Sequence, residues 1–192
     1  GPIRIGALYG DVPSEAGRCK WPRSGKDFLC PILKCINCNG TMIWKESDHE
    51  QANERLVCHN CQWTITDDTF PLTRKSLIAF PPDILFTTTE MLNQRLSDNR
   101  LSHLFGIGAH AVRPPELVLL DEVHTYEGLH GAQVAYLLRR WQYLVEQQLR
   151  FVGLSATLRE AASFFGMLTG ARQTQVEEIS PNRDELETEG AE

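Results

Sequence analysis

Two carboxylates follow directly on four apolar residues in the stretch LVLLDEVH, residues 117–124. Neighbouring side chains of an extended segment point in opposite directions, so Asp121 and Glu122 are expected to have different roles. An acid at the end of a buried strand can hold Mg²⁺, because this ion prefers oxygen ligands and keeps part of its water shell. The second acid can polarise a water molecule for attack on a phosphate. The pair therefore predicts phosphate chemistry, with Asp121 as metal ligand and Glu122 as base.

Two further strand ends carry small polar residues. The stretch RFVGLSATL, residues 150–158, is typical of a buried strand with a polar end, where Ser155 and Thr157 offer hydroxyls to the acidic pair or to a neighbouring domain. The stretch FTTTEML, residues 86–92, places three threonines after another apolar run. Ligands of open parallel sheets bind at the carboxyl ends of the strands. The polar strand ends therefore predict one shared site.

The elements that must position these residues alternate between strand and helix. Strands are expected over residues 3–10, 84–87, 117–121 and 150–158, with a last strand at 173–179. Helices are expected after Thr88 or Thr89 as N-cap, over 131–148 as an amphipathic helix, and over 159–170. Residues 11–29 are rich in Gly, Pro, Ser and Lys and predict an irregular connection. This alternation predicts an α/β fold whose parallel sheet is covered by helices on both faces.

Four of the six cysteines form two matched pairs. Cys35 and Cys38 make one C-x-x-C, Cys58 and Cys61 make another, and 19 residues separate the pairs. This spacing is typical of a tetrahedral Zn²⁺ site of zinc-ribbon type, with strands expected at TMIW and RLV. Four buried reduced cysteines are the alternative, but they would have no reason to occur as two pairs. Cys19 and Cys30 lie outside the pattern.

Composition sets only broad bounds. The chain has 192 residues, 42% of them hydrophobic and 23% charged, and a net charge of −6. No apolar run approaches the roughly 18 residues of a membrane span, and no secretion signal opens the chain, so we expect a cytoplasmic protein without a membrane partner. Residues 18–45 carry six basic residues against Asp27 alone, whereas residues 173–192 carry seven acids against Arg183. A basic segment can contact phosphates, although a solvated surface explains both segments equally well.

The motifs together resemble those of the superfamily 2 DExH-box DNA helicases. DEVH followed by LSATL is similar to motifs II and III, and DEVHTYEGLHGAQVAYLLRR resembles the branch of the RecQ-like mitomycin-repair helicases and the DISARM anti-phage helicase subunit. FTTTEML and YGDVP resemble that branch's TNPDML and GDTP segments. The sequence departs from the pattern at Thr89, where the family has proline, and at Glu127, where it has arginine.

The resemblance implies a RecA-like sheet and a role for each matching residue. Asp121 would coordinate Mg²⁺ and Glu122 would be the catalytic base in ATP hydrolysis. The coupling of ATP state to nucleic acid would depend on His124 and on the motif III residues Ser155, Ala156 and Thr157. The residues implied in nucleic-acid binding are Thr87, Thr88, Glu90 and Asp11.

One motif of such a motor is missing from these residues. No G-x-x-x-x-G-K-[ST] loop occurs, so the chain is expected to be a part of the first RecA-like domain that does not hydrolyse ATP alone. The expected organisation is a partial RecA-like domain at 1–29 and 65–180, with a zinc ribbon of four cysteine ligands inserted at 30–64. Residues 181–192 would be an acidic tail or linker toward a second RecA-like domain.

Three functional hypotheses follow. The first is a fragment of an ATP-dependent DNA helicase or translocase that uses ATP, Mg²⁺ and a structural Zn²⁺. Its partners would be single-stranded or forked DNA, the second RecA-like domain of the parent chain and a defence or repair protein. The second is a zinc-dependent module that binds nucleic acid or protein on a non-hydrolysing scaffold. The third is an RNA helicase, which would share motifs II and III. The intact Asp121–Glu122 pair favours a motor over the second hypothesis.

Overall fold

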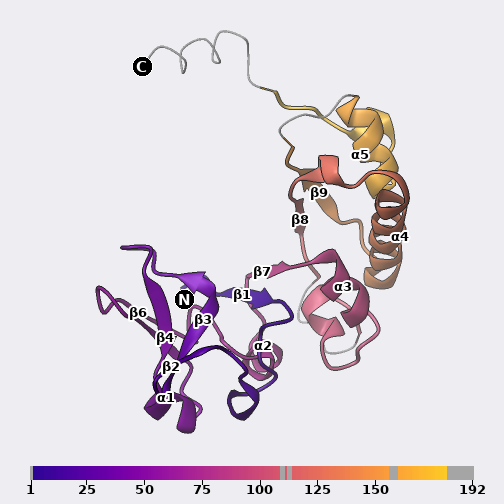
Figure 1. The fold of residues 1–192 in the computed structure, drawn as a ribbon. Coiled ribbons are helices and arrows are strands. Elements are labelled where there is room, and N and C mark those ends of the chain that lie inside the picture. The colour runs from indigo at the N-terminus through magenta and orange to yellow at the C-terminus, as the bar shows by residue number, and fades with distance from the viewer. Residues whose placement is uncertain (1, 109–110, 112–113, 156–159, 181–192) are drawn as a thin grey trace, which may run out of the picture. The chain divides into compact units, whose positions relative to one another are not determined.

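A computed structural model describes residues 2–108, 111, 114–155 and 160–180 of the chain (Figure 1). The chain divides into two compact units, Gly1–Arg113 and Pro114–Glu192, and each is described by itself. Among the described residues, no helix is long and apolar enough to cross a membrane.

The first unit contains a pair of parallel strands. Strand β1 (Ile5–Leu8) lies beside β7 (Ile84–Thr87), with Ile5 opposite Ile84 and Leu8 opposite Thr87. Helix α3 (Thr89–Arg95) follows β7 directly, and the Thr88 hydroxyl accepts a hydrogen bond from the Met91 amide at its start. The predicted strand and helix cap are therefore confirmed. Helix α2 (Arg74–Ala79) and the 3₁₀ helix Ser102–Phe105 complete this part.

The same unit contains a five-stranded antiparallel sheet in sequence order. Its strands are β2 (Arg23–Ser24), β3 (Asp27–Lys34), β4 (Thr41–Trp44), β5 (Arg55–Cys58) and β6 (Thr64–Thr66), and helix α1 (Glu46–Glu50) joins β4 to β5. Met42, Trp44, Leu56 and Cys58 are 0% exposed and form its core.

The expectation of an irregular connection over 11–29 was wrong in its second half. Gly25 has a φ of 63°, which lets the chain reverse tightly between β2 and β3. The 3₁₀ helix Ala16–Arg18 precedes this hairpin. A buried Phe28 on β3 and the contact of the Arg23 guanidinium with its ring, 4.2 Å from the centroid, hold the two strands together.

The second unit contains the other parallel pair. Strand β8 (Leu117–Leu120) lies beside β9 (Arg150–Gly153), with helices α4 (Gly128–Val145) and α5 (Ala161–Thr169) and the 3₁₀ helix Val123–Thr125. The predicted amphipathic helix is confirmed, and its buried stripe comprises Val134, Leu137, Leu138, Trp141 and Val145. Helix α5 ends at Gly170, as expected, with a φ of 82°.

The strand expected at 173–179 was wrong. Residues Gln173–Gln175 form a 3₁₀ helix instead. The Arg172 amide donates to the Gln175 side-chain oxygen, and the Gln175 amide donates to the Arg172 carbonyl. These local bonds close a turn, so the apolar Val176 and Ile179 do not continue a strand.

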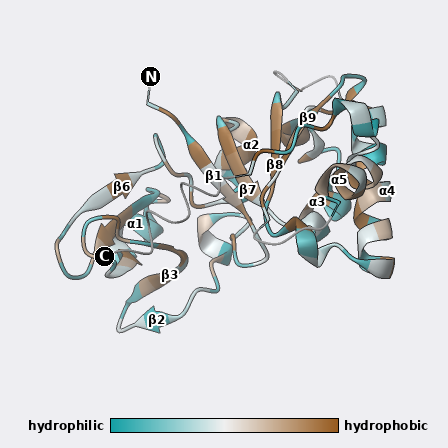
Figure 2. Cartoon of the chain, turned by 90° about the horizontal axis from the view of Figure 1, so that it is seen from above, coloured by the Kyte–Doolittle hydropathy of each residue, from teal (hydrophilic) through white to brown (hydrophobic). Residues whose placement is uncertain are grey.

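The described fold is mixed α/β, with the predicted parallel pairing present as two separate pairs. Figure 2 shows β1, β7 and β8 as mainly hydrophobic strands. Alternate side chains of β7 and β8 are nevertheless exposed, with exposed fractions of 54% for Phe86 and 63% for Leu119. Such strands are typical of sheets that are covered on both faces.

Candidate functional site

The acidic pair lies where β8 ends in the second unit. Asp121 and Glu122 are both exposed, and the Glu122 amide donates to the Asp121 carboxylate at 3.0 Å. Glu122 has a left-handed backbone with a φ of 49°. A non-glycine residue in this conformation costs roughly 1 kcal/mol or more, and such residues gather at functional sites. The turn directs the chain from the strand into the 3₁₀ helix Val123–Thr125.

Backbone bonds bring the end of β9 to this turn. The Leu154 amide donates to the Leu120 carbonyl at 2.8 Å, and the Val123 amide donates to the Leu154 carbonyl at 3.0 Å. The pairing of β8 with β9 is thus continued beyond both strands. Ser155 is consequently held beside the acidic turn, although 31 residues separate it from His124.

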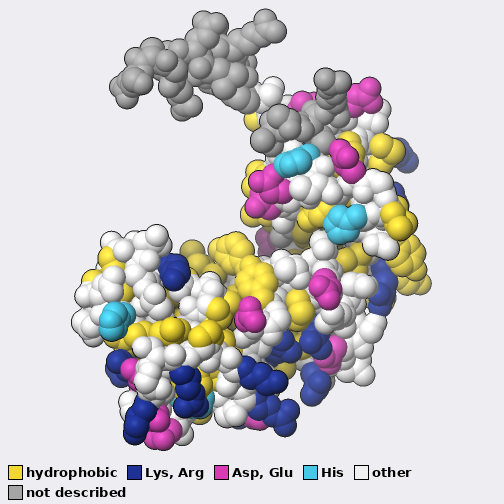
Figure 3. Space-filling model, in the orientation of Figure 1, with side chains coloured by type: hydrophobic (Ala, Val, Ile, Leu, Met, Phe, Trp, Pro, Cys, Tyr) yellow, Lys and Arg dark blue, Asp and Glu magenta, His cyan; other side chains and the backbone are white. Residues whose placement is uncertain are grey.

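His124 lies between the base candidate and motif III. Its Nδ1 is 3.3 Å from the Glu122 carboxylate and 3.2 Å from the Ser155 hydroxyl oxygen. An open cavity of about 220 Å³ is lined by Asp121, Glu122, Leu154 and Ser155. Figure 3 shows acidic and histidine side chains on one face of this unit. Four predicted site residues therefore come together, whereas Ala156 and Thr157 lie outside the described residues.

The segment after the turn packs closely against the start of α4. Burial raises the pKa of the Tyr126 phenol, and the negative charge of Asp121 adds to this effect. The Tyr126 ring is 5.6 Å from the His130 ring between centroids. Gly131 makes the close approach possible, since a Cβ at this position would lie 2.1 Å from the Tyr126 carbonyl oxygen. The close contact of Gly131 with Tyr126 thereby holds the segment after the acidic turn against the start of α4.

The four residues predicted to contact nucleic acid lie in the first unit. The Thr87 hydroxyl donates to the Leu8 carbonyl at 3.0 Å, and the Thr88 hydroxyl caps α3. Glu90 is exposed and accepts a hydrogen bond from Gln94, and Asp11 is exposed while its carbonyl accepts one from the Trp21 indole. Both threonine hydroxyls thus have bonds within the unit.

The four predicted cysteine ligands converge at one end of the antiparallel sheet. Their sulfur atoms all lie within 4.8 Å of one another. Cys35 and Cys61 are 3.5 Å apart, as are Cys38 and Cys58, and Cys38 is 3.6 Å from Cys61. Tetrahedral Zn²⁺ with Zn–S bonds of about 2.3 Å would hold its sulfurs about 3.8 Å apart. The cluster therefore has the donors and the spacing that this ion needs.

Backbone amides surround the sulfurs and shift their acidity. The Cys61 amide is the main cause that lowers the pKa of the Cys58 thiol to about 6. The Gly40 amide lowers the pKa of Cys38, but the hydrogen bond with Cys58 and burial outweigh it and raise this pKa to about 12. A Cβ at Gly40 would lie 3.1 Å from the Cys38 sulfur, so a glycine suits this turn. The opposed shifts of Cys38 and Cys58 thus reflect hydrogen bonds shared within the group of thiols.

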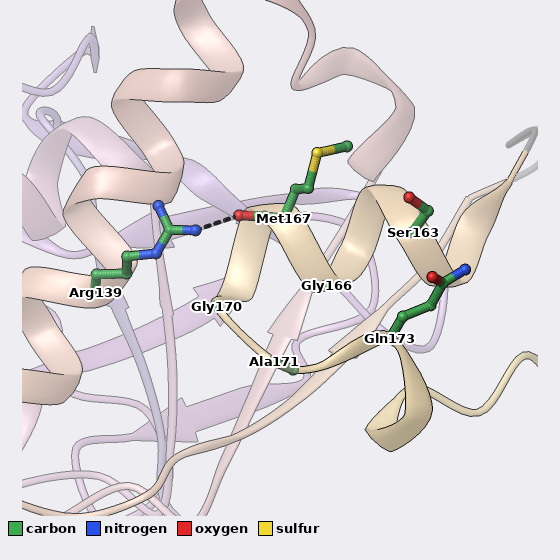
Figure 4. A pocket seen from close by; sticks show the side chains of 7 residues that line it. All are labelled: Arg139, Ser163, Gly166, Met167, Gly170, Ala171 and Gln173. Atoms are coloured by element: carbon green, nitrogen blue, oxygen red, sulfur yellow. Dashed lines mark hydrogen bonds between the residues drawn. The ribbon is translucent and has the colours of Figure 1, made fainter.

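A second cavity, which the sequence did not suggest, lies between α4 and α5 (Figure 4). It has a volume of about 330 Å³, and its lining comprises Arg139, Ser163, Gly166, Met167, Gly170, Ala171 and Gln173. The Arg139 guanidinium donates to the Met167 carbonyl at 2.7 Å. This arginine therefore joins two helices, and the cavity brings no acid, base or nucleophile together.

A buried carboxylate in the first unit was also missed. Glu54 is 7% exposed and accepts hydrogen bonds from the start of α2. The sequence offered one weak signal, since Glu54 directly precedes the strand RLVC and falls at alternate positions with Leu56 and Cys58, which share its buried face.

A family model for DEAD/DEAH box helicases matches residues 46–164. The chain belongs to the DEAD/DEAH box helicase family. The matched range includes the acidic turn, His124 and Ser155, and the helicase family expected from the sequence is confirmed. Cys58 and Cys61 lie inside the range, whereas Cys35 and Cys38 precede it.

Curated relatives agree with this assignment. The chain is 37% identical over 112 residues to the Lhr helicase/uracil glycosylase of Escherichia coli K12, and this alignment covers 58% of the chain and 7% of that protein. It is 35% identical over 103 residues to the ATP-dependent helicase hrq1 of Schizosaccharomyces pombe, which covers 50% of this chain and 9% of that protein. The aligned segment thus spans less than a tenth of either relative. No solved structure matches the chain significantly.

Proposed function

We propose that this helicase segment is the later part of the first RecA-like domain of an ATP-dependent DNA helicase or translocase. The observation that carries the proposal is the contact of His124 with both Glu122 and Ser155 at the ends of two paired parallel strands. In the proposed organisation, residues 1–29 and 65–180 belong to that domain and 30–64 form the insert. Residues 181–192 lead to a second RecA-like domain. The stretch HTYEGLHGAQVA favours the branch of the mitomycin-repair and DISARM helicases.

The acidic turn has two carboxylates that could act in ATP hydrolysis, as a metal ligand and as a base. Asp121 is exposed at the strand end, where its carboxylate suits Mg²⁺. Bound Mg²⁺–ATP would supply the γ-phosphate that water attacks. Glu122 would take the proton of that water. Both residues line the same open cavity, so the metal ion and the attacking water would meet there.

His124 and Ser155 would transmit the state of this site. His124 contacts the carboxylate of the base with the same ring nitrogen that lies beside the Ser155 hydroxyl. A change at Glu122 therefore alters what the ring can bond to at Ser155. Motif III continues from there into Ala156 and Thr157, for which we propose the same coupling role.

DNA is the proposed substrate of the parent protein. The proposed contacts are Thr87, Thr88, Glu90 and Asp11, which lie in β7, at the start of α3 and in the turn after β1. The Thr87 hydroxyl donates within the unit, whereas the Thr88 hydroxyl accepts a bond and keeps its proton, so we expect the Thr88 hydroxyl and backbone amides of this segment to meet phosphates. Figure 3 shows lysines and arginines gathered at one end of the first unit, which suits a polyanion. An RNA substrate is the alternative.

A structural Zn²⁺ is proposed for the Cys35, Cys38, Cys58 and Cys61 cluster. The donors and spacing given above support it, as does the Gly40 turn beside the Cys38 sulfur. This cluster also supports the second hypothesis, a zinc-dependent module that binds nucleic acid or protein on a scaffold without hydrolysis.

The test is DNA-stimulated ATP hydrolysis by the full-length parent. Glu122→Gln should lower the rate by about 10²–10⁴-fold while nucleotide binding is kept, because only proton transfer is lost. Glu116→Gln is the matched control, since Glu116 is an exposed acid before the same strand. This variant should hydrolyse ATP at the rate of the wild type. A wild-type parent that binds DNA but never hydrolyses ATP would refute the motor and support the binding module. Stimulation by RNA alone would favour the RNA helicase.

A further inference from the structure

The Glu54 carboxylate organises the start of helix α2. It is 7% exposed and accepts hydrogen bonds from the Leu72 amide at 2.5 Å, the Thr73 amide at 3.1 Å, and the Thr73 and Ser76 hydroxyls, both at 2.6 Å. A buried carboxylate is tolerated when its oxygens are hydrogen-bonded in this way. All four donors come from five consecutive residues, so this one side chain holds the beginning of α2 in place.

The same strand connects Glu54 with the cysteine cluster. Glu54 directly precedes β5, and Cys58 is the last residue of that strand. Glu54, Leu56 and Cys58 occupy alternate positions and are all buried, which places them on one face. The strand is held on both sides, since Met42 of β4 pairs with Cys58 and Thr66 of β6 pairs with Arg55. Because β5 is paired along its length, we expect a shift of Cys58 to shift Glu54 as well.

Helix α2 in turn holds the turn that follows β1. The Arg74 amide donates to the Pro13 carbonyl at 2.9 Å, and the Lys75 amide donates to the Ser14 carbonyl at 3.1 Å. The Arg74 guanidinium donates to the Tyr9 carbonyl at 3.2 Å. These bonds fix residues 9–14, the turn that contains Asp11. Glu54 therefore links the start of the metal-carrying strand, through α2, to this turn.

We propose that Glu54 is a positioning residue that makes the order of α2 and of residues 9–14 depend on metal binding by the cysteine cluster. The inference rests on the metal site proposed above. Metal would fix Cys58 and with it the register of β5, which sets the place of the Glu54 carboxylate. Without metal, the carboxylate would lose its position under residues 72–76, and the first amides of α2 would exchange with solvent.

Hydrogen exchange of the whole 192-residue chain tests this, with and without one equivalent of Zn²⁺. Zn²⁺ should slow exchange at Arg74 and Lys75 by at least about tenfold in the wild type. In Glu54→Gln, Zn²⁺ should still bind and still slow amide exchange at Cys35 and Cys58. The exchange rates of α2 should then be the same with and without Zn²⁺. Glu50→Gln, an exposed acid on α1, should behave as the wild type does.

Two further readouts separate the possible failures. Zinc content, measured on the same samples, reports the metal site itself, and a wild type that binds no Zn²⁺ would overturn both the metal site and this proposal. Stoichiometric Zn²⁺ with equal protection of α2 in Glu54→Gln would overturn the role of Glu54 alone. If Glu54→Gln does not fold, Ser76→Ala removes one of the four bonds and should weaken the metal dependence partly. An unchanged metal dependence in Ser76→Ala would then refute the proposal.

Discussion

The cysteine cluster and the acidic turn differ in how they are built. The four cysteines lie within 27 residues of sequence, and Cys35 and Cys58 are buried at 3% and 0% exposure. Asp121, Glu122 and Ser155 are exposed and come from two strands that α4 separates in sequence. The cysteine cluster is thus half-enclosed by its own hairpins, with Cys38 and Cys61 exposed, whereas the acidic turn is an open edge.

This difference indicates which site supports the fold and which one acts. Thiols that bind one metal ion contribute the free energy of binding to folding, and this is the role proposed for the cysteine cluster. Exposed carboxylates contribute little to stability, and a left-handed Glu122 opposes it. Substitutions in the cluster should therefore lower stability, and substitutions at the strand ends should lower turnover.

The largest effect is expected from Cys58→Ser. The serine removes a proposed metal ligand, the Cys58 side chain, which is 0% exposed in the core of the sheet. Structural Zn²⁺ binding is worth roughly 10 kcal/mol or more in small zinc domains, so the antiparallel sheet should unfold. Zinc content and circular dichroism of the 192-residue chain would measure this.

Cys19→Ser is the control for that substitution. Cys19 lies outside the cluster and is partly exposed, and burial is the main cause that raises the pKa of its thiol. This variant should keep one Zn²⁺ per chain. Equal metal content in Cys58→Ser would contradict a four-cysteine site and remove the contrast between the two regions.

Gly131→Ala should have the next largest effect, in the second unit. Alanine is favoured over glycine in an open helix position, but the added Cβ would lie 2.1 Å from the Tyr126 carbonyl oxygen. Because that oxygen is backbone, the turn must move, and we expect about 1–3 kcal/mol of destabilisation. Urea unfolding would measure it, with Gln133→Ala on the exposed side of α4 as control. A stabilised Gly131→Ala would show that the turn is free to shift.

The features that depend on short stretches of sequence were predictable. Strand Ile84–Thr87, the Thr88 cap and the stripe of α4 follow from local periodicity and capping, and all were confirmed. The four cysteines were found because their ligand spacing is itself a local pattern. The convergence of Ser155 with His124 was indicated by the polar strand ends and by motif order, and the contact itself depends on the pairing of β8 with β9.

The misses depend on contacts that the sequence does not encode locally. Glu54 has the residue type of a surface position, and only the fold places it under residues 72–76. The β2–β3 hairpin was hidden by a Gly- and Lys-rich stretch that reads as a loop. The strand expected at 173–179 was wrong because the Gln175 side chain accepts a hydrogen bond from the Arg172 amide within a local turn.

Tyr126→Phe should have a smaller effect that appears only at alkaline pH. Burial, and then the charge of Asp121, raise the pKa of this phenol above its ordinary value of 10. The unfolded chain therefore loses the proton first, and the stability of the wild type should fall as the pH rises above 10 toward the raised pKa. The variant should lack this part of the decline, by less than about 1 kcal/mol. Urea unfolding at pH 9 and 11 measures it. An equal fall in the free energy of unfolding between pH 9 and 11 in both proteins would contradict a raised pKa of the Tyr126 phenol.

The smallest change in stability is expected for Ser155→Ala, which sharpens the comparison most. Ser155 is exposed, and its hydroxyl contacts His124 at 3.2 Å, so its loss should change the free energy of unfolding by no more than about 0.5 kcal/mol. In the full-length parent, basal ATP hydrolysis should remain, because Glu122 is intact, whereas stimulation by DNA should be lost. A variant that loses stability but keeps DNA stimulation would reverse the assignment, since Ser155 would then support the fold as Cys58 does. Loss of stimulation at unchanged stability would instead identify the edge between β8 and β9 as the part of the helicase segment that responds to nucleic acid.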